Sequence, residues 1–482
     1  MQTALMRVGE WAVAEFGGAE LHDRRRSRRL VGVATQLAAR PHGKLPESFG
    51  NWSELKAAYR LLEEPQITHA AILAPHIERV REECRRAGEY LFVEDTTELD
   101  FSAHPAAADL GPIGDGKGRG LFVHSTLALR IDAWTAQHEP RVVIPGLAAQ
   151  SCWVRDLPHG ATYEKKAKRL TRPRESQRWA ASVEQIGSPP PQRRYTFMAD
   201  READIYETIQ RCQDRQWDFI VRASQPRAMA DQEGSIFDAV AASPCVARFR
   251  IELRSRPKRV TKNKKTGKPK RVRKAHGPRT VELEVRSCSV LLRAPWRPGG
   301  AGEPRRVHLV EAREVNPRPD DDPIHWVLLT SWACGSESEA MRVVKAYTRR
   351  WLIEEYHKAL KTGTGIEDSQ LRRAQRIEAL LGILAVVAVR LLNRKLLATT
   401  HPDQAVDRGE IGEATLRILE AVVGPPAEGW TNRHVIRAIA KMGGFIGRKS
   451  DGEPGWVTIW RGWQILIPMV RGFDLAMREG CG

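Results

Sequence analysis

Three acidic residues from widely separated parts of the chain could together bind divalent metal ions. Asp95 follows an apolar stretch at residues 90–93, Asp200 follows a second one at 195–199, and Glu354 lies in a segment rich in helix formers. Transfer of a phosphodiester requires both the attacking and the leaving oxygen to be stabilised. Two divalent ions about 3.5–4 Å apart, held by carboxylate oxygens, can do this. Because the chain contains 59 acidic residues, spacing alone does not single out these three.

The segment 347–363 is predicted to be one uninterrupted helix, because helix formers fill it and it contains no proline. At about 100° per residue, one face is polar and the opposite face is apolar. A solvated face with i,i+4 ion pairs such as Glu354–Lys358 would explain the pattern. The two other acids favour a catalytic face instead. The polar face carries Tyr347, Arg350, Glu354, Lys358 and Lys361.

The elements that must position these acids follow an α/β pattern. Strands are predicted at 90–93, 121–131 and 141–147, followed by a helix at 173–186, a strand at 195–199, a helix at 203–212 and a strand at 219–222. This order predicts a mixed sheet flanked by helices. Asp95 and Asp200 then lie at or just beyond the carboxyl ends of two strands, where ligand sites of open α/β sheets occur.

The first 80 residues are predicted to be helical, with segments at 11–16, 23–39 and 52–62. Five arginines at the start of the second helix lie at the positive end of its dipole, which is electrostatically unfavourable, so binding of an anionic partner there would reduce the repulsion. Contact with phosphates is the functional interpretation, and a merely basic surface is the alternative. No zinc-finger, homeodomain or zipper spacing is present, so base contacts cannot be assigned. The five are Arg24, Arg25, Arg26, Arg28 and Arg29.

The charge of the chain indicates a polyanionic partner. The net charge is +18, and residues 254–279 contain 13 Lys and Arg without one acid. Nucleic acid is a more natural partner for such a chain than a membrane. The basic run lies in a proline-rich region with short predicted strands at 247–253, 281–285, 290–292, 307–310 and 326–330, which suggests a β-rich insertion with an exposed loop. A nuclear-localisation-like signal and a solvating loop are the alternatives to phosphate binding.

The remaining features predict a soluble protein of a reducing compartment. Seven cysteines show no C-x-x-C pair, which argues against a disulfide framework or a zinc site. The longest apolar run, 379–389, is too short to span a bilayer and is expected to lie in a buried helix at 371–398. No membrane partner is therefore expected. Residues 400–482 are predicted to be helical, with tryptophans at 456, 460 and 463.

Sequence motifs resemble one enzyme family. VEDTT at 93–97, ADREADIY at 199–206 and the spacing Tyr347, Arg350, Glu354, Lys361 together resemble the DDE transposases of bacterial insertion sequences. The Tyr–Arg–Glu–Lys signature is similar to that of the subgroup containing the transposase of the composite transposon Tn5. Further matches at 118–125, 220–227, 326–331 and 443–456 extend the resemblance over nearly the whole chain, although 400–426 matches only loosely.

The resemblance implies a fold, a domain order and a metal site. It implies an RNase H-like catalytic domain at 81–399, interrupted by the β-rich insertion at about 223–335. A helical DNA-binding domain at 1–80 would precede it, and a helical dimerisation domain at 400–482 would follow. Asp95, Asp200 and Glu354 would be the catalytic residues and would bind two Mg²⁺ ions, or Mn²⁺, per active site.

The resemblance also implies contacts with DNA. Arg350, Lys358 and Lys361 would contact phosphates at the transposon end, and Tyr347 would bind a phosphate near the cleaved position. Arg222 would reach the DNA backbone. Trp326, 21 residues before Tyr347, would stack on a base flipped out of the duplex; a core position is the alternative for this tryptophan.

The implied function is cut-and-paste transposition by a homodimer acting on double-stranded DNA. Each transposon end would be nicked, converted to a hairpin, opened and joined to target DNA, in the cytoplasm of a bacterium and in association with its nucleoid. Two alternatives remain open, a sequence-specific metal-dependent endonuclease of the same fold and a domesticated DNA-binding repressor. The sequence does not identify the terminal inverted repeats or the target preference.

Overall fold

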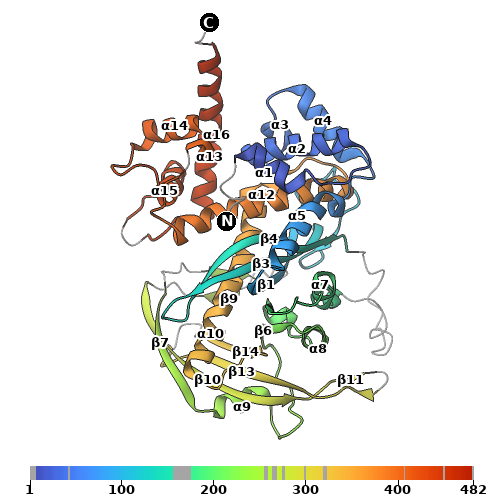
Figure 1. The fold of residues 1–482 in the computed structure, drawn as a ribbon, viewed down its shortest axis with the longest axis vertical. Coiled ribbons are helices and arrows are strands. Elements are labelled where there is room, and N and C mark those ends of the chain that lie inside the picture. Colours follow the sequence, from blue (N-terminus) through green and yellow to red (C-terminus); the bar gives the residue numbers. More distant parts are fainter. Residues whose placement is uncertain are drawn as a thin grey trace.

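The structure is a computed structural model, and it describes residues 7–41, 44–155, 175–253, 259–262, 269–273, 277–297, 300–318, 323–406, 408–448 and 451–479. The helical N-terminal and C-terminal parts lie side by side at one end of the molecule (Figure 1). The other end consists of a large sheet with helices packed against it. Among the helices of the described ranges, none has the length and apolar character to cross a membrane.

Five helices form the N-terminal part. Asp23 caps α2 through a hydrogen bond from the backbone N–H of Arg25 at 2.8 Å, and Asn51 and Thr68 cap α4 and α5 in the same way. The predicted helices are confirmed, but α5 was not predicted because Pro75 lies inside it and interrupts the sequence pattern. The bounds are α1 Val8–Phe16, α2 Arg24–Ala39, α3 Leu45–Ser48, α4 Trp52–Glu63 and α5 His69–Cys84.

The central sheet is mixed, as predicted. β1 pairs in parallel with β5 and β5 with β6, whereas β1 pairs antiparallel with β3 on its other side. The strand order is β2-β3-β1-β5-β6-β14-β13-β10-β7, and β4 pairs with β3. The bounds of the first six strands are β1 Gly88–Asp100, β2 Gly111–Ile113, β3 Gly118–Trp134, β4 Pro140–Trp153, β5 Arg193–Ala199 and β6 Asp218–Arg222.

The strands of the β-rich region continue this sheet. β14 pairs antiparallel with β6, so the region does not form a sheet of its own. Two strands predicted at 281–285 and 290–292 are one strand, β10; the prediction was wrong because a bulge in its pairing with β7 between Val285 and Arg286 breaks the period-2 pattern. The bounds are β7 Cys245–Leu253, β10 Arg279–Leu292, β13 Arg305–Glu314 and β14 His325–Thr330.

Two small two-stranded sheets accompany this region. β8 Arg259–Lys262 and β9 Pro269–Arg273 form a two-stranded sheet within the predicted basic run; the rest of that run up to residue 276 lies outside the described residues. β11 Trp296–Arg297 pairs with β12 Gly300–Ala301.

Helices cover both faces of the central sheet. α7 Arg178–Ile186 and α8 Tyr206–Asp214 pack on one face, where Trp179 and Ile209 join Phe92, Phe197 and Phe219 in one core. α5 and the long helix α12 Ala374–Thr400 pack on the other face. The predicted apolar run in α12 is buried throughout, which explains its composition without a membrane. α9 Ile236–Ala242 packs against β10 and β13.

The segment 347–363 is not one uniform helix, contrary to the prediction. α10 Glu337–Tyr347 runs into a 3-10 turn at Thr348–Arg350, then α11 Trp351–Lys358 and a π-helical turn at Ala359–Gly363. Because a 3-10 turn advances about 120° per residue and a π turn less than an α-helix, the predicted single polar face does not persist. Tyr347, predicted on the polar face, is buried at 4% exposure, with its ring packed against Trp326.

The C-terminal part is helical, as predicted, and has its own core. Leu416, Leu419, Ile439, Ile459 and Leu466 are buried together there. The bounds are α13 Arg408–Ile411, α14 Glu413–Val423, α15 Asn432–Met442 and α16 Trp456–Glu479.

Candidate active site

Asp95 and Asp200 lie at the same level on neighbouring parallel strands. The pairing of β1 with β5 ends at Val93 opposite Met198, and each aspartate lies two residues beyond that last pair. Asp95 is not at the end of its own strand, contrary to the prediction, because β1 continues to Asp100 alongside β3. Both aspartates therefore lie just beyond the parallel pairing of β1 with β5, at the carboxyl end of β5.

The two carboxylates repel each other. Burial raises the pKa of Asp95 to about 7, and the Asp200 carboxylate adds to the rise, whereas the Thr96 N–H and the Arg350 charge oppose it. The Oδ1 atom of Asp95 accepts a hydrogen bond from the Thr96 N–H at 2.8 Å, and Asp200 accepts one from the Glu202 N–H at 2.8 Å. Close, part-buried carboxylates are the donor set of a divalent cation site, since a cation would relieve their repulsion.

Glu202 is a further acid of this cluster that the sequence analysis did not single out. Burial raises the pKa of Glu202, and the charges of Asp200 and Glu98 raise it further. Its position in the motif ADREADIY, two residues after Asp200, is the signal that could have indicated it.

Glu354, the third candidate metal ligand, is engaged in an ion pair with Arg350. The Nη2 atom of Arg350 donates a hydrogen bond to Oε1 of Glu354, one helical turn along the chain. In the described ranges, no three His, Cys, Asp or Glu side chains are grouped closely enough to bind a metal ion. The structure therefore brings two of the three candidate ligands together and leaves the third paired with a cation.

Three buried polar residues, Glu94, Thr126 and His124, lie behind Asp95 between β1 and β3. Glu94 is fully buried on the face opposite Asp95, where it accepts hydrogen bonds from Thr126 at 3.0 Å and contacts Nε2 of His124 at 3.1 Å. Thr126 and His124 belong to β3, so these contacts hold β1 and β3 in register beside Asp95.

Three candidate DNA-binding residues meet beside Asp200. The rings of Trp326 and Tyr347 are packed edge to face, with centroids 5.5 Å apart. Burial raises the pKa of Tyr347 to about 12, and the charges of Arg350 and Arg222 oppose the rise. Arg222 donates to the carbonyl of His325 at 2.7 Å, and its Nε is buried without a hydrogen-bond partner among the described residues.

The two lysines of the signature helix have carboxylate partners. Lys358 lies 2.9 Å from Oε1 of Glu355, so the predicted Glu354–Lys358 pair is replaced by Glu354–Arg350 and Glu355–Lys358. Lys361 lies 3.6 Å from Oε1 of Glu367. Trp351, to which the sequence analysis assigned no role, is 52% exposed next to Arg350, with the Lys358 ammonium 4.7 Å from its ring centroid.

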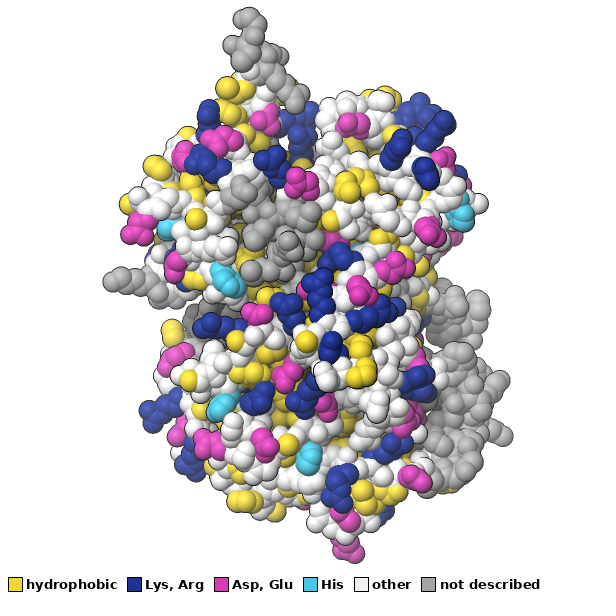
Figure 2. Space-filling model, viewed as in Figure 1, with side chains coloured by type: hydrophobic (Ala, Val, Ile, Leu, Met, Phe, Trp, Pro, Cys, Tyr) yellow, Lys and Arg dark blue, Asp and Glu magenta, His cyan; other side chains and the backbone are white. Residues whose placement is uncertain are grey.

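The arginines of α2 are mostly exposed at the surface. Arg24, Arg25, Arg28 and Arg29 are exposed, whereas Arg26 pairs with Glu64 at 2.8 Å and so ties α2 to the residues after α4. Figure 2 shows Lys and Arg side chains on the N-terminal helices and across the middle of the same face, where the helical end of the molecule meets the sheet.

Comparison with known proteins gives three family matches in chain order. A transposase DNA-binding model matches residues 8–67, a transposase DDE domain model matches 172–390, and a transposase Tn5 dimerisation model matches 423–479. Together they cover well over half of the chain. The DDE match includes Asp200, Arg350 and Glu354, and Asp95 lies before it.

One solved structure is also similar. It is the cryo-EM structure of a piggyBac transposase synaptic complex with hairpin DNA, with 9% sequence identity over 85% of this chain and 76% of that chain, and a TM-score of 0.37. This similarity is too distant to carry an argument about the present chain.

The family matches assign the main properties of the protein. It has a DNA-binding part and a dimerisation part, and between them lies a DNA-cleaving and strand-transferring enzyme that depends on a divalent metal. Since the three models occur together and in this order, the chain belongs to the Tn5-like DDE transposases.

Proposed function

We propose that this chain is a cut-and-paste transposase that binds the inverted repeats at the ends of a transposon, cleaves them by nicking, hairpin formation and hairpin opening, and joins the 3′ ends to target DNA. The observation that best supports this proposal is the position of Asp95 and Asp200 at one level of the sheet, each two residues beyond the last β1–β5 pair, together with the Arg350–Glu354 ion pair. Each of these steps is a phosphoryl transfer, so one metal site could catalyse all of them in turn.

Asp95, Asp200 and Glu354 would hold two Mg²⁺ ions, or Mn²⁺. The donor set suits these ions, because all three ligands are carboxylates and two of them repel each other in the structure. When bound, the ions supply charge stabilisation to both the attacking and the leaving oxygen. The pairs formed by Asp95 with Thr96 N–H and Asp200 with Glu202 N–H orient the two aspartates for this purpose.

Binding of DNA would complete the site. A guanidinium forms strong bidentate contacts with phosphate, so a phosphate of the bound end would compete with Glu354 for Arg350. Glu354, released from Arg350, would then be available as the third ligand. This order would favour metal binding when the substrate is in place.

The remaining candidate residues would position the DNA. Lys358 and Lys361 would contact phosphates beside Arg350, and Tyr347 and Arg222 would do so next to Asp200. Trp326 would stack on a flipped base; this would require its indole to exchange its contact with the Tyr347 ring for the base. The exposed arginines of α2 would bind phosphates of the recognised sequence. They are Arg24, Arg25, Arg28 and Arg29, with Arg26 beside them.

The proposed domains are 1–80 for DNA binding, 81–399 for catalysis with the insertion at about 223–335, and 400–482 for dimerisation. The matched ranges 8–67, 172–390 and 423–479 fall inside these three ranges, which supports the division. Two protomers would bridge two transposon ends in one synaptic complex, associated with the bacterial nucleoid.

The test is a cleavage and joining assay. The purified protein is incubated with labelled duplexes carrying the inverted repeats that flank its gene, a supercoiled target plasmid and Mg²⁺. Nicked, hairpin, blunt-ended and plasmid-joined products in that order would support the proposal. Cleaved ends that never join to the plasmid would favour the endonuclease alternative, and binding without any cleavage would favour the repressor.

A further inference from the structure

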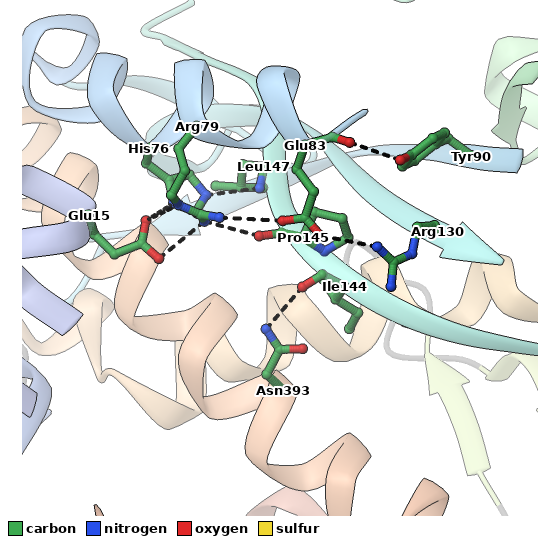
Figure 3. A network of polar contacts seen from close by, with 10 residues as sticks. All are labelled: Glu15, His76, Arg79, Glu83, Tyr90, Arg130, Ile144, Pro145, Leu147 and Asn393. Atoms are coloured by element: carbon green, nitrogen blue, oxygen red, sulfur yellow. Dashed lines mark hydrogen bonds and ion pairs between the residues drawn. The ribbon is translucent and has the colours of Figure 1, made fainter. Parts of the chain in front are cut away.

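A buried polar network joins the DNA-binding part of the chain to the catalytic sheet. Figure 3 shows Glu15 of α1 pointing toward His76 and Arg79 of α5, with Pro145 and Leu147 of β4 on the other side of these two side chains. Glu15 is 2% exposed and His76 is fully buried. Since α1 belongs to the matched DNA-binding region and β4 to the sheet, the network lies at the joint between them.

His76 and Arg79 each form directional bonds both to Glu15 and to the backbone of β4. Nδ1 of His76 lies 2.6 Å from Oε2 of Glu15, and Nε2 of His76 accepts the Leu147 N–H at 3.0 Å. Because Nε2 accepts a hydrogen bond, Nδ1 carries the ring proton and donates a hydrogen bond to Oε2 of Glu15. Arg79 donates to both carboxylate oxygens of Glu15 at 3.1 Å and to the carbonyl of Pro145 at 3.1 Å.

The β4 strand is shaped to receive these side chains. Among the named strands β4 pairs only with β3, and side chains from two helices bond to its backbone: Arg79 to Pro145, His76 to Leu147, and Asn393 of α12 to Ile144 at 3.2 Å. Gly146 has a φ of +146°, and a Cβ there would lie 2.6 Å from the His76 ring. Only glycine permits this backbone conformation and this close approach.

Hydrogen bonds through Gln150 of β4 connect this joint to the candidate active site. β4 carries Gln150, whose side-chain amide donates to Ser125 and to the hydroxyl of Tyr356, each at 2.9 Å. Ser125 lies opposite Asp95 in the β1–β3 pairing, and Tyr356 lies on α11 two residues after Glu354. His69 of α5 contacts the same glutamine at 2.9 Å. The helix that receives Glu15 is therefore connected by hydrogen bonds to the strands and helix that carry the candidate metal ligands.

An apolar contact would hold the two parts together without defining one orientation. A carboxylate with three directional bonds, buried where water cannot replace them, is satisfied in only one arrangement. We propose that Glu15, with His76 and Arg79, is a positioning device: it fixes the orientation of the end-binding helices relative to the sheet, and so sets the distance between the recognised sequence and the phosphodiester that is cut. This inference rests on the proposed function.

The experiment maps the cut at nucleotide resolution. Wild-type protein and Glu15→Gln, which keeps the size of the side chain but loses the ion pair with Arg79, are given Mg²⁺ and labelled end duplexes. The duplexes are the native end and two versions with one base pair added or removed between the protected sequence and the cut. Affinity for the ends, melting temperature and hydrogen exchange at the Leu147 amide are measured on the same preparations.

We expect Glu15→Gln to bind ends with an unchanged Kd but to spread its cuts over neighbouring phosphodiesters. Cutting at the native position should fall by about tenfold or more, because a displacement of about 1 Å can cost about a hundredfold. Wild type should discriminate strongly against the two altered spacings, and the variant should discriminate less. Glu82→Gln is the matched control, since Glu82 is an exposed residue of α5 that pairs with Arg85 on the solvent side.

The outcomes separate the two claims. Faster exchange at Leu147 in a variant that still cuts only at the native position, with wild-type discrimination between spacings, would overturn the inference and leave the network a packing feature. If Glu15→Gln does not fold, Arg79→Lys, which removes the two-pronged contact at a partly exposed side chain, is measured in the same way with the same criteria. Ends that wild type binds but does not cut would overturn the proposed function instead; altered Leu147 exchange together with a changed protected stretch in a footprint would then still support the inference.

Discussion

The guanidinium of Arg350 is ion-paired with the carboxylate of Glu354, one helical turn away. This ion pair engages the third candidate metal ligand, whereas Asp95 and Asp200 lie at the same level, two residues beyond the last β1–β5 pair. Arg350 therefore has two possible partners, Glu354 and a DNA phosphate, and metal binding is expected to depend on which one it contacts.

Replacing Arg350 should uncouple metal binding from DNA. We expect Arg350→Gln to bind Mn²⁺ more tightly than wild type without DNA, by about threefold to tenfold, because Glu354 is no longer paired with a part-buried cation. Cleavage of transposon ends should nevertheless fall, since a phosphate contact is lost. Isothermal titration with Mn²⁺ checks the first expectation and a nicking assay the second. Arg349→Gln, the neighbouring arginine, is the control; equal metal affinity in all three proteins would contradict the idea that Glu354 is sequestered.

The three carboxylates should be required for cleavage but not for binding of ends. Asp95→Asn, Asp200→Asn and Glu354→Gln should each lower the cleavage rate by about a thousandfold or more, since the metal ions contribute several kcal/mol to the transition state. Gel-shift affinity for the ends should stay within about twofold, because the basic surfaces are unchanged. Cleavage within tenfold of wild type by any of the three would remove that residue from the proposed metal site.

Trp326→Ala should impair hairpin formation more than first-strand nicking. If the indole stacks on a flipped base, its loss removes about 1–3 kcal/mol from a step that needs the extruded nucleotide. An end substrate that lacks this base should partly rescue the variant, because the unstacking cost is then absent. A gel that resolves nicked, hairpin and double-end-break products gives the measurement.

A structural role for Trp326 makes a different prediction. The indole is half-buried and packs against the Tyr347 ring, so its loss could act through Tyr347 alone. In that case nicking and hairpin formation should fall together, the melting temperature should drop, and the substrate lacking the base should give no rescue. Tyr347→Phe, which keeps the ring contact and removes the hydroxyl, distinguishes loss of packing from loss of the phosphate contact.

The contribution of Glu15 to stability should depend on pH. Burial raises the pKa of Glu15, but the contacts with His76 and Arg79 outweigh burial, so the net shift is downward from 4.5. A lowered pKa in the folded state means that ionised Glu15 adds stability above about pH 4.5, and that this contribution is lost as the pH falls further through the folded-state pKa. Melting temperatures of wild type and Glu15→Gln should therefore differ most above about pH 4.5, and the difference should shrink as the pH falls below that value. A difference that stays constant from pH 7 to 3.5 would contradict the ion pair.

Local patterns in the sequence determined much of the architecture. The amphipathic helices α2 and α4, the strands leading to Asp95 and Asp200, and the buried apolar helix α12 follow from period and composition, with Asp23 as the predicted cap of α2. These signals need only residues within a few positions of each other, so one chain segment contains them in full. The motifs around Asp95, Asp200 and Tyr347 likewise identified the family before any contact was known.

The relationships between distant segments were decided only by the tertiary structure. The common level of Asp95 and Asp200 depends on a parallel register between strands about a hundred residues apart. The burial of Tyr347 depends on its packing against Trp326 and the surrounding core. Glu354 pairs with Arg350, and Lys358 pairs with Glu355. A helix allows these pairs and the predicted Glu354–Lys358 pair alike, so only the tertiary structure decides between them. Glu15 gave no sign of function in the sequence, because its partners His76 and Arg79 lie more than sixty residues away and only packing of α1 on α5 brings them into contact.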